Sequence, residues 1–122
     1  MQTLQDVSGA ARDAAERIRN RTARYAAIPV GDIAESVELL IAATVRYAEH
    51  GDSSRADQHL RRLLALRAAQ EVTPADLRQA LKELRMMTLS LGPELTTATH
   101  EELEKASRFV EARALELFDR MR

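Results

Sequence analysis

Hydrophobic positions along this chain recur at intervals of three and four residues, which is the spacing of helices with one apolar face. They predict helices over about residues 4–25, 32–50, 54–67, 74–91 and 99–122. The inner face of the third contains Leu60, Leu63 and Leu64, and its continuation reaches Arg67. No segment alternates between apolar and polar residues as a half-buried strand would. The sequence therefore predicts an all-α fold of about five helices in a single domain.

Capping signals place the ends of these helices. Thr73 followed by Pro74 predicts the start of the fourth helix, because threonine caps the first amides and proline fits the first turn. Thr99 with Glu102 predicts a capping box at the start of the last helix. Further boundaries are predicted at Asp32 (an N-cap), Gly51 (a C-terminal glycine), Ser53 or Ser54 (an N-cap) and Gly92-Pro93 (the end of the fourth helix).

The last predicted helix has a regular apolar face. Its members step by three or four residues and are Leu103, Ala106, Val110, Ala114 and Leu117. Arg113 stands where a continuous heptad seam would need an apolar residue, so the face is not a strict coiled coil. The face could pack on its own bundle or pair with a second chain, and both possibilities are open at this point. In the second case these five residues form the interface of a homodimer.

The helical pattern continues to Arg122 without a terminal glycine, proline or polar tail. We therefore expect the natural protein to continue beyond this residue, although a frayed C-terminal helix explains the pattern equally well. Residues 1–98 would then form a regulatory bundle, and residues 99–122 a dimerisation and signalling helix of the same domain. Met86 and Met87 add a second apolar edge to the fourth helix, which is either buried or offered to a partner.

Composition and charge exclude several functions. The 122 residues contain no cysteine, which excludes disulfides, thiol catalysis and cysteine-based metal sites. The longest apolar run, residues 39–43, is too short for a transmembrane helix. Residues 1–10 lack the basic and apolar regions of a secretory signal, so we expect a cytoplasmic protein without membrane contact. The net charge is −1 and acids lie among the arginines, so we expect no direct nucleic-acid partner.

The histidines are the remaining candidates for metal, haem or phosphotransfer chemistry. His50, His59 and His100 are not part of a Glu-x-x-His or His-Glu-x-x-His motif, so no ligand set is visible. His59 has no acid directly after it, and His100, which does, lies in the first turn of its helix. The chain also lacks a nucleophile elbow and a glycine-rich phosphate loop. We therefore expect no enzymatic activity, no cofactor and no metal.

Two segments have sequences similar to a known family of regulators. The first, Arg24-Tyr25-Ala26-Ala27-Ile28-Pro29, is similar to the pattern Arg-x-Tyr-Ala-x-Leu-Pro, except that Arg24 directly precedes Tyr25. The second, RAAQEVTPADL at residues 67–77, is similar to an Arg-Ala-x-Gln-Gly-Val/Phe run that leads into a helix. Both patterns resemble the N-terminal regulatory domain of RsbR/RsbRD co-antagonist proteins and the segment ahead of some PucR-like regulators. Glu71 stands where that family has glycine, so we expect the turn to differ there.

The resemblance covers about residues 5–95 and implies a fold and a function. It implies a globin-like helical module without haem, dimeric, that passes a signal through a helix to a downstream STAS or DNA-binding domain. It brings no catalytic residues. We therefore expect a non-enzymatic regulatory input module of a bacterial signalling protein, with a second copy and other proteins of a stressosome-like assembly as partners. The alternative is a scaffold or adaptor domain with no ligand of its own, which binds through Met86 and Met87.

Overall fold

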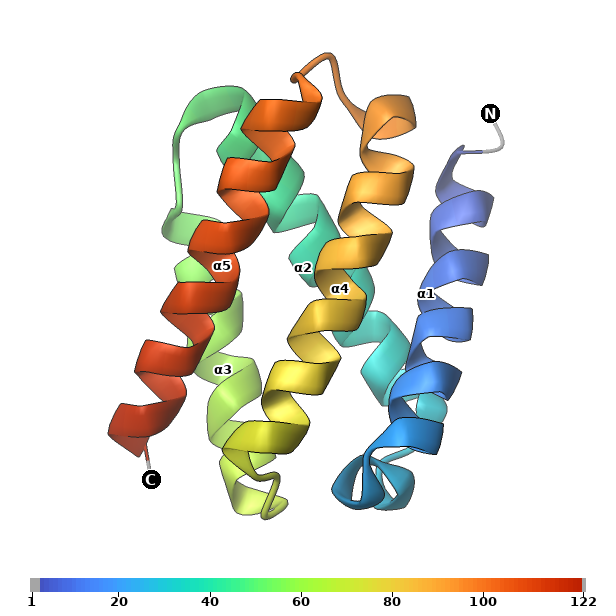
Figure 1. Ribbon diagram of the computed structural model, residues 1–122, viewed down its shortest axis with the longest axis vertical. Helices are drawn as coiled ribbons and strands as arrows, with labels where there is room; N and C mark the ends of the chain where they lie inside the picture. Colours follow the sequence, from blue (N-terminus) through green and yellow to red (C-terminus); the bar gives the residue numbers. More distant parts are fainter. Residues whose placement is uncertain (1–2, 122) are drawn as a thin grey trace.

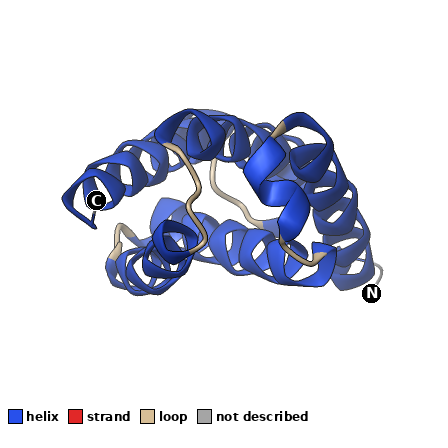
Figure 2. Cartoon of the chain, turned by 90° about the horizontal axis from the view of Figure 1, so that it is seen from below, coloured by secondary structure: helices blue, strands red, loops and turns tan. Residues whose placement is uncertain are grey.

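The chain folds into helices joined by short loops. The computed structural model describes residues 3–121, and within them the side chains of residues 7–121 other than Ala23 and Pro93; Arg122 lies outside the described residues. The elements are α1 (Thr3–Arg21), a 3₁₀ helix η1 (Ala23–Ala27), α2 (Val30–His50), α3 (Ser54–Ala69), α4 (Pro74–Leu95) and α5 (His100–Met121). Figure 2 shows no strand in this described part of the chain. The prediction of an all-α domain with five helices is confirmed.

The helices form two layers, with α5, α4 and α1 side by side in one of them (Figure 1). In that layer α4 runs antiparallel to both neighbours. In the other layer α2 crosses obliquely and contacts all four other α-helices, while α3 lies beside it and behind α5. The core therefore lies around α2, whose buried residues are Ile33, Val37, Leu40, Ile41, Ala43, Thr44 and Val45.

Three predicted helix ends are confirmed by their hydrogen bonds or backbone angles. The Thr73 hydroxyl accepts a hydrogen bond from the Asp76 amide at 3.1 Å, and α4 starts at the following proline. Thr99 and Glu102 form the capping box, since each backbone amide donates to the other side chain, at 2.9 and 3.1 Å. Gly51 ends α2 with a φ of 70°, in the left-handed region that favours glycine.

Three predicted ends are wrong. The first helix ends at Arg21 rather than near residue 25, because Thr22 has an extended backbone, and the separate 3₁₀ helix η1 follows it. The second helix begins at Val30 rather than after Asp32, because Pro29 takes the N-cap position and its carbonyl accepts from the Asp32 amide at 3.1 Å. The fourth helix continues through Gly92-Pro93 to Leu95, where the Gly92 carbonyl accepts from the Thr96 amide at 3.1 Å. Proline costs the helix one amide donor and crowds the carbonyl four residues earlier, but it stands in the last turn, and α4 still continues to Leu95.

Gly92 has a packing role instead of a terminating one. A Cβ atom at this position would overlap Cδ1 of Leu103, which is fully buried. The absence of a side chain therefore allows α5 to pack closely on α4 near the loop that joins them.

An ion cluster holds α1 against α4. Glu83 of α4 is only 3% exposed, and its carboxylate accepts hydrogen bonds from Arg17 Nε at 3.1 Å and from Arg21 Nη1. Both arginines are about half exposed, so their charges stay partly hydrated while the carboxylate does not. The buried carboxylate of Glu83 is thus paired with two partly exposed arginines, which compensate its charge.

Candidate functional site

The apolar face of α5 lies inside the single chain. Its five members, Leu103, Ala106, Val110, Ala114 and Leu117, are at most 2% exposed. They belong to a helix that packs on α2, α3 and α4. Because they have almost no accessible surface in one chain, a second chain has nothing to contact at these positions. The structure therefore corrects the predicted dimer interface: this face is core of its own bundle, which was the other possibility.

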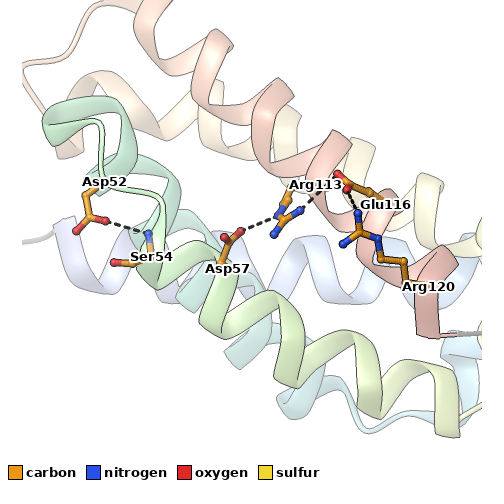
Figure 3. A network of polar contacts seen from close by, with 6 residues as sticks. All are labelled: Asp52, Ser54, Asp57, Arg113, Glu116 and Arg120. Atoms are coloured by element: carbon orange, nitrogen blue, oxygen red, sulfur yellow. Dashed lines mark hydrogen bonds and ion pairs between the residues drawn. The ribbon is translucent and has the colours of Figure 1, made fainter.

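Arg113 explains why the apolar face is interrupted. Its Nε donates to Asp57 Oδ1 of α3 at 3.1 Å, and its Nη1 lies 3.4 Å from Glu116 Oε2, as Figure 3 shows. The hydrogen bond that Arg113 donates to Asp57 and the negative charge of that carboxylate raise the pKa of Arg113 above its ordinary value. Glu116 also accepts from Arg120 at 2.6 Å. The polar residue that breaks the heptad pattern thus connects α5 to α3.

The two methionines of α4 have different environments. Met87 is buried in the core, whereas Met86 is 55% exposed. Both line an open groove of about 360 Å³ between α1 and α4, together with Arg17 and Arg21. The predicted partner-facing edge is therefore reduced to one exposed side chain.

The histidines lie apart from one another. His50 and His100 are exposed, and His59 is half-buried in a groove between α2 and α3. Among the described side chains, which begin at residue 7, no group of three or more histidines, aspartates or glutamates is arranged to hold a metal ion. Within residues 3–121, no helix has both the length and the apolar character needed to cross a membrane.

The two segments that carry the family resemblance meet in space. The guanidinium carbon of Arg67 lies 5.5 Å from the ring centre of Tyr25, within the range of a cation–π contact. Arg24 and Glu71 form an exposed ion pair at 3.7 Å between the same segments. Glu71 has a φ of 61°, the left-handed conformation that glycine adopts without strain. The glutamate therefore takes a conformation that suits the glycine of the family pattern.

Arg67 is the largest fully buried side chain, at 2% exposure. Its Nη1 donates to Gln70 Oε1 at 2.9 Å and its Nη2 to Ser36 Oγ at 3.4 Å. These acceptors are neutral, and among the described residues no carboxylate lies within ion-pair distance of the guanidinium. We call Tyr25, Ser36, Arg67 and Gln70 the Arg67 site. Its signals in the sequence are an arginine at an inner position of the third helix and the two segments of the family resemblance, which contain Tyr25, Arg67 and Gln70.

Tyr25 does not supply the missing negative charge. Burial raises the pKa of its hydroxyl above 10.0, while the charge and hydrogen bond of Arg67 lower it by less. The nearby carboxylate of Asp76 adds to the increase. The phenol therefore stays protonated and neutral at physiological pH, with its ring against the guanidinium.

A cavity of about 40 Å³ lies beside the Arg67 site. Its lining is apolar except for three members of that site, and comprises Ile18, Tyr25, Ile33, Ser36, Val37, Leu40, Leu63, Arg67, Leu77, Ala80, Leu81 and Leu84. A surface groove of about 160 Å³ between α2 and α3 shares Ser36, Leu40 and Leu63 with the cavity. These three residues therefore form the wall between the groove and the buried arginine.

Comparison of the chain with family models, with curated proteins and with solved structures finds no match. The resemblance to the RsbR-type regulatory domain thus stays a prediction, and the residues of the Arg67 site have to be interpreted from their own chemistry.

Proposed function

We propose that this chain is a non-enzymatic regulatory input module of a bacterial signalling protein, in which α3 links the Arg67 site to α5. One observation carries the proposal: a fully buried guanidinium has only neutral hydrogen-bond partners, and its residue is one of those that line a cavity. A buried charge without a counter-ion costs several kcal/mol, and an apolar residue would fill the position more stably. Features that sacrifice stability in this way are typical of functional sites.

The position of α3 supports a role in transmission. Arg67 lies near the C-terminal end of this helix, and Asp57 near its N-terminal end accepts a hydrogen bond from Arg113 of α5. The same helix packs on α2 and α5. A displacement of α3 caused by a change at Arg67 is therefore transferred to α5 through this contact. The family resemblance supports the same route, since it implies a signal that leaves through the terminal helix.

Amide hydrogen exchange tests this linkage without knowledge of the signal. Arg67→Met removes the charge but keeps much of the side-chain volume, and Arg61→Met is the matched control at an exposed position of α3. We expect Arg67→Met to change the exchange of α5 amides around Arg113, and Arg61→Met to leave them unchanged. In an Asp57→Asn background the effect of Arg67→Met on α5 should become small. A change confined to α3 and η1 would contradict the proposal.

The homodimer of this proposal needs a surface other than the α5 face. Leu39 and Leu66, which are 42% and 50% exposed, line the groove between α2 and α3. Exposed large apolar residues that lie together favour protein contact. Sedimentation equilibrium should therefore show a dimer that Leu39→Glu/Leu66→Glu converts to monomer and Met86→Glu does not. Dissociation by Met86→Glu alone would instead favour the scaffold or adaptor alternative, through the groove between α1 and α4.

A further inference from the structure

The Arg67 guanidinium has more donors than the protein satisfies. A guanidinium carries five N–H groups in a fixed planar arrangement. The acceptors that it reaches are the Gln70 amide oxygen and the Ser36 hydroxyl, which are both neutral, while Tyr25 offers its ring face. The remaining donors and the uncompensated positive charge suit one ligand with two acceptor oxygens and one negative charge. A carboxylate has this chemistry and pairs with arginine through both oxygens.

The cavity restricts what is attached to that carboxylate. Its volume of about 40 Å³ exceeds the space that one water needs, about 10–15 Å³, so a ligand of a few non-hydrogen atoms fits. Apart from the Arg67 site, every lining side chain is aliphatic. A second charge, as in a dicarboxylate or a phosphate dianion, would face these aliphatic walls without a partner. An aliphatic tail would instead replace water against Leu40, Leu63 and Leu84.

We infer that the cavity beside Arg67 binds a short-chain aliphatic monocarboxylate, with its carboxylate on the guanidinium and its tail among the aliphatic walls. This inference rests on the proposed function and names the class of ligand that the regulatory site takes. Ser36 and Gln70 position the guanidinium from two sides, and the Tyr25 ring covers one of its faces. The ligand would neutralise the one charge that the fold leaves unpaired in this part of its core.

Titration of ¹⁵N-labelled protein with sodium propionate tests the inference by NMR, with sodium chloride and sodium phosphate at matched ionic strength as references. We expect saturable shifts for amides of η1, α3 and the start of α4, with an affinity in the millimolar range that is typical of so small a ligand. Affinity should rise from acetate to propionate and fall again for chains too long for the cavity. Phosphate that binds as tightly as propionate, or no saturable shift at all, would overturn the inference.

Two variants locate the site. Arg67→Met should weaken propionate binding by at least about tenfold, because it removes the charge-assisted pair, while Arg61→Met should leave binding unchanged. Ala80→Leu fills the cavity from α4 and leaves Arg67 in place, so it tests the site even if the first variant folds poorly. We expect Ala80→Leu to abolish binding. Binding that survives in folded Ala80→Leu protein would place the ligand elsewhere and refute the inference.

The two proposals fail in distinguishable ways. If propionate does not bind but Arg67→Met still changes hydrogen exchange in α5, the ligand class is wrong and the linkage through α3 stands. If propionate binds at Arg67 and exchange in α5 does not respond, the site is real and the regulatory role is wrong.

Discussion

A charge placed at Val110 tests whether the α5 face belongs to the core of one chain or to a contact between two. Val110 is 1% exposed, so Val110→Asp would bury a carboxylate among α2, α4 and α5. The loss of the buried valine costs about 1.5–3 kcal/mol, and an unpaired buried carboxylate adds several kcal/mol more. The void beside this position holds about 10 Å³, which admits at most one water, so the carboxylate cannot be hydrated there.

The expected loss of at least about 4 kcal/mol is a large part of the stability of a domain, which is about 5–15 kcal/mol. Arg108→Asp introduces the same group two residues earlier on the exposed side of α5, where the side chain is 66% exposed. It removes the exposed pair with Glu104 and should cost less than about 1 kcal/mol. Both variants place an aspartate on α5, one at a buried and one at an exposed position, so the comparison isolates the effect of burying the carboxylate.

Urea unfolding followed by circular dichroism, with light scattering on the same samples, gives the comparison. We expect Val110→Asp to be unfolded or to unfold at a much lower urea concentration, and Arg108→Asp to stay close to the unmodified protein. A Val110→Asp protein that remains fully helical and stable but becomes monomeric would refute this reasoning. That result would mean that the α5 face is a seam between chains, contrary to its burial within one.

Three further predictions concern backbone and capping positions. Gly92→Ala should destabilise the protein by about 1–3 kcal/mol in urea unfolding, since its Cβ must displace a buried leucine of α5. Gly9→Ala, with no atom within 4 Å of the added carbon, should stabilise the protein by about 0.5–1 kcal/mol. Equal effects of the two substitutions would contradict the close packing of α4 and α5. The hydrogen bond from the Thr99 amide holds the pKa of Glu102 below its ordinary value, so the stability that this carboxylate adds is present at neutral pH and is lost as the pH falls through its folded-state pKa. The difference in urea midpoint between the protein and Glu102→Gln should therefore close as the pH is lowered from about 7 to about 3, and a constant difference would refute the assignment. Glu71→Gly should raise the melting temperature, because it relieves up to about 1 kcal/mol of left-handed backbone strain, and a lower melting temperature would show that the ion pair with Arg24 matters more.

Helix number and most helix ends could be predicted from the sequence because they depend on local chemistry. The capping threonines, Thr73 and Thr99, and the terminal glycine, Gly51, act on backbone groups within a few residues, so the signal and its effect lie together. Gly92-Pro93 misled the prediction because the same dipeptide can end a helix or allow a close packing contact. Only the position of Leu103 on the facing helix decides between the two.

The candidate site could be predicted much less completely. Periodicity shows which positions of a helix face inward, but it does not show whether the covering surface is another helix of the same chain or a second chain. It also places Arg67 on an inner face without showing that no acid reaches it. Both facts depend on contacts between segments far apart in the sequence, such as Arg67 with Tyr25 and Ser36.

Under the proposed function, the burial of α5 determines how a signal would leave this domain. A helix that pairs with a second chain can transmit by changing that pairing, whereas a helix held in its own bundle moves with the helices that it contacts. For α5 these are α2, α3 and α4, and its polar edge is joined to α3 through Arg113 and Asp57. Arg67 also lies on α3. Pairing its charge with a counter-ion would therefore act on the helix that also holds α5. Asp57→Asn weakens that connection without altering the Arg67 site or the apolar core of α5, which is why it separates transmission from ligand binding.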